Sequence, residues 1–515
     1  MALPANTGLE GSVRETRFAA NVIWAWASVI VSAVAGLLLT PYLIRKLGSD
    51  GYGVWALCFS LVDYYWFFDL GFRSATVKYV AHHTAREELE KISEVLSTSL
   101  LYAAILAVFL GLIVPLNLSR ITHFFKVAPA YQSAFTLLLL LVTMSWAVGV
   151  VFGLFGASIE AVQRLDLTTK VTVTATTVRV LGTAVLLYLG YGLVPVGLMV
   201  ISSQVVSYVL YFYFYRRLFT GVRLSLHLAS LSKLKELSKF GIHSFLMTFS
   251  TQLQSQSAPV LIGHFLPAAF VGYYNLPMRL VQYAVEFVAK IGIVTNINAA
   301  ELSAKDDTST LSQLAIYTNR YCLVIFMPLA ILLWVDGRQF FTLWVGEKVA
   351  VYSVQVLPIL LLGFVVAVVG QFSSSMLLMG MAKHQRYARA LLAEALLGFV
   401  LLTYAIPRYG MVGAAWVVAV LMILIRGVYT WYIVSQTVGI SMWSYVRGVY
   451  LSPVMAAVPV FILAKILKTA VIPGHSWFQI ALLGAVIGLT YYSVALFVSA
   501  RSDHRRLLLQ KLGVG

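Results

Sequence analysis

Long apolar segments follow one another along almost the whole chain, separated by short polar ones. About 20 apolar residues are enough for a helix to cross the hydrocarbon core of a membrane. The segments lack the polar–apolar alternation of membrane β-strands, so the sequence predicts an all-α polytopic membrane protein. Fourteen spans are expected, at residues 20–44, 52–80, 96–118, 134–158, 171–189, 193–215, 240–261, 268–295, 315–335, 352–379, 388–406, 411–434, 446–467 and 478–500.

The composition agrees with this prediction and excludes two other classes of protein. Of the 515 residues, 60% are hydrophobic and 11% are charged, whereas soluble domains carry about 25% charged residues. This charged fraction is too small to cover the surface of a soluble protein. The high fraction of hydrophobic residues excludes a disordered chain. The two cysteines, Cys58 and Cys322, lie in apolar segments, so neither a disulfide framework nor a metal site is expected.

The basic residues indicate how the spans are oriented. The net charge is +17, and most lysines and arginines lie between apolar segments. With fourteen spans, 23 of them fall on the side of the N-terminus and 9 on the opposite side, which is the bias expected of cytoplasmic loops. We therefore expect a multi-pass membrane protein with both termini in the cytoplasm, and no nucleic-acid partner.

Three short motifs recur in the second half of the chain at offsets of 218 to 222 residues. They are Pro-x-Leu-Ile at 41–44 and 259–262, Gln-Arg at 163–164 and 385–386, and Tyr-Gly-x-Val at 191–194 and 409–412. The repeat covers six spans, an even number, so two parallel six-helix lobes are predicted. The expected domains are an N-terminal lobe at 1–215, a cytoplasmic linker at 216–239, a C-terminal lobe at 240–434, and two additional spans with a basic tail at 435–515.

The linker is the longest basic stretch of the chain. Leucines recur there every three residues, at positions 228, 231, 234 and 237, with lysines between them. This pattern is typical of an amphipathic helix lying on the membrane surface. A solvated linker is the alternative, and in both cases the segment joins the two lobes.

The first two spans carry a pattern of turn and packing residues: Pro41, Arg45, Leu47, Gly48, Gly51, Tyr52, Gly53, then Asp69, Leu70, Gly71 and Ala75. With Val271-Gly272-Tyr273 and the arrangement of six, six and two spans, it resembles the polysaccharide-transport or O-antigen flippases. These belong to the multidrug/oligosaccharidyl-lipid/polysaccharide (MOP) exporter superfamily, and the resemblance covers nearly the whole chain. It implies translocation of a polyprenyl-diphosphate-linked oligosaccharide across the inner (cytoplasmic) membrane, without a cofactor. The implied partners are that lipid-linked oligosaccharide, membrane lipids, and polysaccharide polymerase and chain-length machinery.

Basic residues inside the spans are candidates for binding an anionic head. Arg279, Glu286 and Lys290 share one face of the eighth span, since a helix turns by about 100° per residue. A helix in lipid does not display three charges on one side, so this face is predicted to line a cavity. Arg279 would lie about 16 Å deep and bind the diphosphate through paired hydrogen bonds. Arg179 of the fifth span is the second candidate.

Acidic residues inside the spans are candidates for coupling to an ion, H⁺ or Na⁺. Asp63 lies in the second span at a depth similar to that of Arg279, and Asp69 and Glu286 are further candidates. The alternatives are structural: an ion pair between Asp63 and Arg279, and a pair within one helix between Asp69 and Arg73.

Two other sets of polar residues lie in spans. Gln252 and Gln256 of the seventh span are predicted to hydrogen-bond either sugar hydroxyls or a neighbouring helix. Glu394 and Arg426, in the eleventh and twelfth spans, are expected to pair with each other or with polar neighbours, because a lone charge in a membrane is costly.

Two other functions stay open at this point. A drug or cation antiporter of the same fold would need an acidic cavity, whereas the deep residues here lean basic. An integral-membrane glycosyltransferase or polymerase would need catalytic acids or a large outward loop. The sequence contains no nucleophile triad, zinc motif or phosphate-binding glycine loop, so neither catalytic residues nor metal ligands are predicted.

Overall fold

The computed structural model describes residues 10–69, 71–470 and 476–499, which form helices and turns and no strands. The chain divides into two compact units, Met1–Gln252 and Leu253–Gly515. This confirms the all-α fold class. The extents of the four domains predicted from the sequence stay a prediction.

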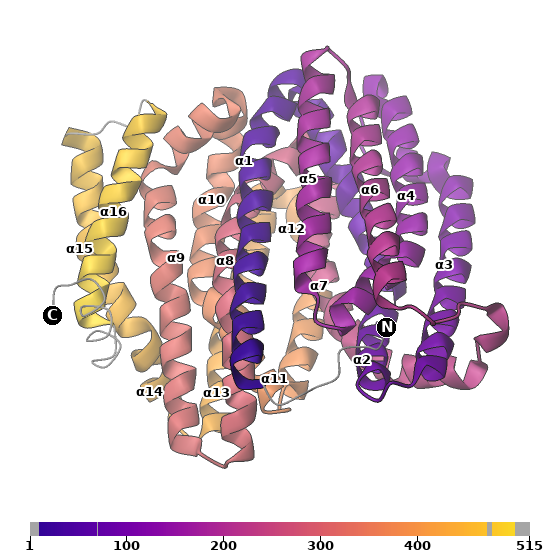
Figure 1. Ribbon diagram of the computed structural model, residues 1–515. Helices are drawn as coiled ribbons and strands as arrows, with labels where there is room; N and C mark the ends of the chain where they lie inside the picture. Colours follow the sequence, from indigo (N-terminus) through magenta and orange to yellow (C-terminus); the bar gives the residue numbers. More distant parts are fainter. Residues whose placement is uncertain (1–9, 70, 471–475, 500–515) are drawn as a thin grey trace. The chain divides into compact units, whose positions relative to one another are not determined.

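The first unit is a bundle of long helices (Figure 1). Neighbouring pairs pack along their length, with α4 between α3 and α6, and α5 between α6 and α1. The elements are α1 (Glu10–Asp63), the 3-10 helix η1 (Tyr64–Asp69), α2 (Phe72–Thr84), α3 (Leu89–Phe124), α4 (Pro129–Ala161), α5 (Leu165–Tyr188), α6 (Leu193–Leu218), the short η2 (Leu226–Leu228) and α7 (Leu231–Phe265), which continues into the second unit.

The second unit is built around α9, which packs on α8, α10, α15 and α16. Three π-helices among the described residues, η3, η4 and η5, interrupt its long helices. The elements are α8 (Ala269–Ala304), α9 (Thr308–Val345), α10 (Glu347–Val368), η3 (Val369–Ser374), α11 (Ser375–Gly380), α12 (Gln385–Leu421), η4 (Met422–Tyr429), α13 (Thr430–Val438), α14 (Met442–Val446), η5 (Arg447–Leu451), α15 (Ser452–Ala470) and α16 (Trp477–Val498).

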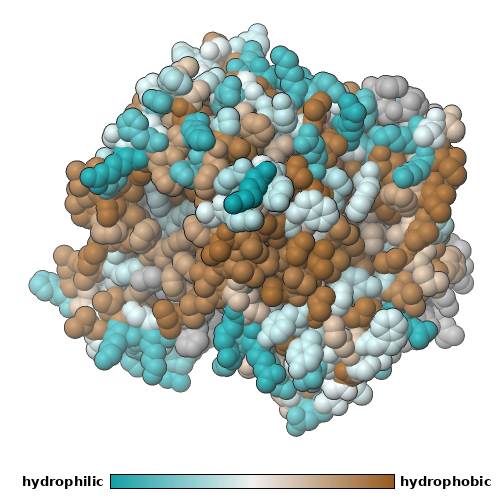
Figure 2. All heavy atoms as spheres, turned by 180° about the vertical axis from the view of Figure 1, so that it is seen from behind, coloured by the Kyte–Doolittle hydropathy of each residue, from teal (hydrophilic) through white to brown (hydrophobic). Residues whose placement is uncertain are grey.

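The surface of the helices is apolar, as a membrane protein requires. On the face shown in Figure 2, hydrophobic side chains gather along the middle of the helices and hydrophilic ones toward their ends. On α3, for example, Ile105, Val108, Leu112 and Leu116 are all more than half exposed. Their spacing of three to four residues makes one helical stripe, and such a stripe is stable against lipid but not against water.

Among the described residues, ten helices are long and apolar enough to cross a membrane. One of them, Gln385–Val438, has 54 residues and would be about 81 Å long if straight, more than twice the hydrocarbon thickness of about 30 Å. Gly410 (φ 60°, ψ −151°) breaks it between the predicted eleventh and twelfth spans. Gly48 (φ 74°) likewise separates the first span from the second. The total of fourteen stays a prediction.

The internal repeat is visible in the backbone as well as in the motifs. Residues with positive φ recur at offsets of 218 or 219: Glu87 and Asp306, Gln163 and Ala382, and Gly221 and Gly439. Few residues other than glycine adopt a positive φ, so two non-glycine pairs at one spacing are unlikely by chance. Three tight turns of the first unit therefore recur at corresponding positions of the second.

The predicted linker, 216–239, does not form a helix of its own. It contains the end of α6, a loop with η2, and the first turns of α7. The backbone N–H groups of Arg223, Ser225 and Ser230 donate to hydroxyls on α3, which holds the loop against that helix. Leu237 is fully buried in the unit, so the leucine pattern serves partly to pack α7.

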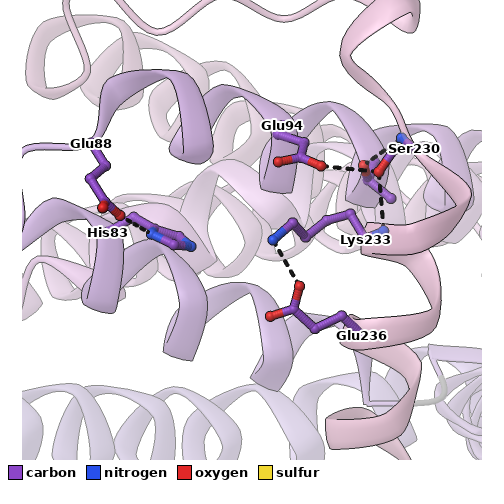
Figure 3. A network of polar contacts seen from close by, with 7 residues as sticks. His83, Glu88, Glu94, Ser230, Lys233 and Glu236 are labelled. Atoms are coloured by element: carbon purple, nitrogen blue, oxygen red, sulfur yellow. Dashed lines mark hydrogen bonds and ion pairs between the residues drawn. The ribbon is translucent and has the colours of Figure 1, made fainter.

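Polar contacts reinforce this end of the first unit (Figure 3). Ser230 donates to Glu94, and Lys233 pairs with Glu236 at 2.8 Å. Lys91 of α3 donates to Glu88, the residue just before that helix, and His83 Nδ1 of α2 lies 2.6 Å from the same carboxylate. These two hydrogen bonds lower the pKa of Glu88 to about 2. The network joins α2, α3 and α7 by charge as well as by apolar packing.

Candidate functional site

The predicted second span, 52–80, is a broken helix rather than a continuous one. It consists of the last part of α1, the 3-10 helix η1 and α2. Gly71, in a left-handed conformation (φ 77°, ψ 12°), precedes α2. Breaks of this kind leave backbone groups without helical partners and, in membranes, occur where protein or water can satisfy them. In transporters they accompany binding sites near the middle of the membrane.

Contacts from three other helices hold the break. A Cβ atom on Gly71 would lie 2.2 Å from the carbonyl oxygen of Gly241 on α7, so the two backbones touch. The Tyr102 hydroxyl of α3 donates to the Phe68 carbonyl at 2.6 Å, which satisfies an acceptor that the break leaves open. Tyr65 is buried, and its hydroxyl lies 2.8 Å from that of Thr143 on α4. The break is therefore fixed by tertiary contacts.

The acidic candidates of this span lie on either side of η1. Asp63 is the last residue of α1 and is half-buried, whereas the side chain of Asp69 lies outside the described residues. Asp69 and Arg73 do not share one helix, as that alternative assumed, because Gly71 separates the helices that carry them. Arg73 instead pairs with Glu160 of α4, at 2.5 Å, and donates to the Gly153 carbonyl.

Two of the three charged residues predicted on one face of the eighth span are described on α8, and the side chain of the third, Lys290, lies outside the described residues. Arg279 and Glu286, seven residues apart, are both exposed. The opposite face, with Tyr274, Val281 and Val288, is fully buried against the second unit. No hydrogen bond or ion pair joins Arg279 to the part of the chain that the structure describes. Its guanidinium is therefore available to an external anion.

The remaining candidates are half-buried and lie on two helices. Arg179 is on α5, which packs between α1 and α6. Gln252 and Gln256 lie one turn apart on α7. The first unit thus holds Asp63, Arg179 and Gln252, and the second holds Gln256, Arg279 and Glu286.

The expected pairing of Glu394 with Arg426 is confirmed. The Arg426 Nε atom lies 3.0 Å from both carboxylate oxygens of Glu394, and both side chains are at most 5% exposed. The pair joins α12 to the π-helix η4. Gly370 of η3 packs directly on the Arg426 carbonyl, where a Cβ atom would have no room.

Reasoning from the sequence missed the break in the second span and the Arg73–Glu160 pair. A signal for the break exists in the sequence: six non-aliphatic residues, 64–69, interrupt the span before a glycine. The partner of Arg73 is 87 positions away in the chain, and no local pattern points to it.

Residues 18–296 match the sequence model of the family described as "Polysaccharide biosynthesis protein". The chain is 22% identical over 507 residues to the uncharacterized membrane protein EpsK of Bacillus subtilis (strain 168), with 96% of this chain and 97% of that protein covered. It is 20% identical over 419 residues to a putative O-antigen transporter of Shigella flexneri, with 80% of this chain and 97% of that protein covered.

Two solved structures show the same fold. The lipid II flippase MurJ in its inward closed conformation is similar with a TM-score of 0.72 and 12% identity, covering 92% of this chain and 98% of that one. An inward-facing multidrug resistance MATE family transporter of the MOP superfamily is similar with a TM-score of 0.60 and 14% identity, covering 81% of this chain and 98% of that one. The resemblance to polysaccharide flippases is confirmed. Because the family model matches more than half of its length, this multi-pass membrane protein belongs to the polysaccharide biosynthesis protein family, on the fold of the MOP-superfamily transporters.

Proposed function

We propose that the protein is a flippase that moves a polyprenyl-diphosphate-linked oligosaccharide across the cytoplasmic membrane by alternating access. Family membership and the similarity to a putative O-antigen transporter support this proposal. The sugar and diphosphate would pass through a polar space, and the polyprenyl tail would stay in lipid. Both termini would be cytoplasmic, and the lipid-linked substrate would be the main partner.

The observation that carries the proposal is the exposed cation on α8. Arg279 lies ten residues from the start of the helix, or about 15 Å, half of a hydrocarbon core of about 30 Å. A charge at this depth is costly against lipid and favours a water-accessible space. A guanidinium there offers a diphosphate up to five N–H donors and keeps its charge at all relevant pH values.

Replacing Arg279 by glutamine should abolish export of the glycan while leaving the protein in the membrane. Glutamine keeps polarity and much of the volume but removes the charge that would attract the diphosphate. Arg279→Lys should retain part of the activity, because a lysine provides the charge without the paired donors. The measurement is surface glycan in a strain whose own gene is deleted, normalised to the amount of protein in the membrane.

Arg408→Gln is the matched control for this experiment. Arg408 is also an exposed arginine of the second unit, and its guanidinium folds back over Tyr404 of the same helix. Its loss should leave surface glycan unchanged. Surface glycan at the wild-type level in Arg279→Gln would remove Arg279 from the substrate path.

Replacing Asp63 by asparagine should uncouple transport from an ion gradient. Asp63 is half-buried at the end of a helix that breaks inside the membrane, a position where a carboxylate can take up H⁺ or Na⁺. In proteoliposomes, the rate of flipping should lose its dependence on an imposed H⁺ or Na⁺ gradient. An Asp63→Asn protein that responds to the gradient like the wild type would exclude this role.

A drug or cation antiporter and a membrane glycosyltransferase are the competing functions. Drug resistance conferred by expression, without any effect on surface glycan, would favour the antiporter. Covalent change of a labelled lipid-linked sugar by the purified protein would favour the enzyme. Movement of the unchanged lipid to the other leaflet is the result that the proposal requires.

A further inference from the structure

A basic groove lies in the second unit, where α12 begins beside η4 and α13. We use this name for the two adjoining cavities, of about 490 and 560 Å³, that share Arg386 and Arg389 in their walls. Lys383 lies on the wall of the larger one. All three side chains are exposed. The groove is large enough for a headgroup, and no acidic residue is among the described residues that line it.

The charge of the basic groove is not neutralised by the protein. None of Lys383, Arg386 and Arg389 forms an ion pair within the part of the chain that the structure describes. The acidic residue next along α12, Glu394, is buried and bound to Arg426. Three uncompensated cations within seven residues repel one another, and an anion bound between them would relieve this repulsion.

The internal repeat supplies a comparison for this arrangement. The backbone matches Gln163 with Ala382, at an offset of 219 residues, and so corrects the offset of 222 at which the two Gln-Arg motifs were aligned in the sequence. With this register, Lys383 corresponds to Arg164, Gln385 to Asp166 and Arg389 to Lys170. In the first unit, Arg164 donates to both oxygens of Asp166, at 2.8 and 2.9 Å. In the second unit an amide replaces that carboxylate, and a further arginine is added at 386. The first basic residue of this turn is thus paired with a carboxylate in the first unit and has no such partner in the second.

An apolar surface continues from the basic groove along the same helices. The smaller cavity has Ala390, Ala393 and Ile425 in its walls. Beyond it, Leu397 and Val400 of α12 and Leu424 of η4 are at least half exposed. A cationic pocket joined to an exposed apolar surface fits a ligand with an anionic head and a hydrocarbon tail better than it fits a free anion.

We propose that the basic groove is a binding site for an anionic phospholipid, whose phosphate contacts Lys383, Arg386 and Arg389 and whose acyl chain lies along α12 and η4. The site would hold a resident lipid of the surrounding leaflet. It is separate from Arg279, which lies on α8, so lipid binding can be measured independently of transport.

The test uses the purified full-length protein and lipids of stated composition. Binding of phosphatidylglycerol is compared with that of phosphatidylcholine of the same acyl chains by native mass spectrometry, at fixed ionic strength. The wild type should prefer phosphatidylglycerol. Each basic residue near an anionic lipid changes affinity about fivefold, so Lys383→Gln, Arg386→Gln and Arg389→Gln together should weaken binding roughly 100-fold.

Two further variants distinguish specific binding in the basic groove from nonspecific electrostatic attraction of the lipid to a basic protein. The first is a triple variant that removes the same charge far from the groove, with Arg164→Gln, Lys170→Gln and Lys305→Gln. Because salt screens charges at such distances, it should change the binding affinity less than about threefold. Gln385→Asp gives the second unit the carboxylate that the first unit has, and should weaken binding about fivefold by pairing with Lys383.

Three results would overturn the proposal. The first is an equal loss of binding in the triple variant and its control. The second is full displacement of phosphatidylglycerol by millimolar inorganic phosphate or pyrophosphate, which would identify a site for free anions. The third is a strong preference for a polyprenyl diphosphate over phosphatidylglycerol, which would assign the basic groove to the transported substrate.

Discussion

Replacing Arg426 by methionine should destabilise the second unit by about 3–5 kcal/mol, because it leaves a buried carboxylate without its partner. Glu394 is 1% exposed, and both of its oxygens lie 3.0 Å from Arg426 Nε. The loss is large because the charge that remains is already out of water, where its solvation cannot be recovered. The measurement is thermal unfolding of the protein in detergent.

The double variant Glu394→Gln with Arg426→Met should be more stable than Arg426→Met alone. Removing both charges leaves no buried ion, and the two side chains keep similar volumes. Arg338→Met is the control for loss of an arginine in an exposed ion pair: its contact with Glu347 has both side chains more than half exposed, so the change should cost less than about 1 kcal/mol. Equal unfolding temperatures for Arg426→Met and Arg338→Met would contradict the prediction.

Replacing Gly71 by alanine should disrupt the break in the second span and abolish transport. An alanine with φ near 77° is strained, by roughly 1 kcal/mol or more. In addition, its Cβ atom would lie 2.2 Å from the Gly241 carbonyl oxygen. The three nearest atoms are all backbone atoms of Gly241, so no side chain can move aside to make room. We expect either α2 or α7 to shift, with loss of surface glycan and a lower unfolding temperature.

Gly439→Ala is the control that separates backbone strain from the steric clash with Gly241. Gly439 has nearly the same conformation (φ 73°, ψ 28°), and no atom lies within 4 Å of the position that a Cβ would take. This variant should lose only the stability that the left-handed conformation costs an alanine, and cells that express it should keep their surface glycan. If Gly71→Ala behaves like Gly439→Ala, the contact with Gly241 does not fix the break.

The two predictions test contacts that differ in how visible they are in the sequence. The sequence predicts that Glu394 and Arg426 pair with each other or with polar neighbours, because isolated charges in apolar spans need partners. The contact between Gly71 and Gly241 has no such signal, because a glycine in a sequence does not say which backbone approaches it.

In the candidate site too, some features follow from the sequence and others do not. The helical period placed Arg279 and Glu286 on one face of α8, and that face is the exposed one. The same reasoning placed Asp69 and Arg73 on one face and was wrong, because it assumed that an apolar run of ordinary length is a single helix. The basic groove was not anticipated, since its cations come together with η4 and α13 only in the folded unit.

The sequence by itself determined the all-α membrane class, the internal repeat, the family and the need of Glu394 and Arg426 for polar partners. Each follows from local hydrophobicity and periodicity, or from the high cost of an unpaired charge in lipid. The tertiary structure alone decided where the second span breaks, which acid neutralises Arg73 and which basic turn stays without a counter-charge. These depend on contacts between segments far apart in the chain, and their energies arise only after the helices have packed.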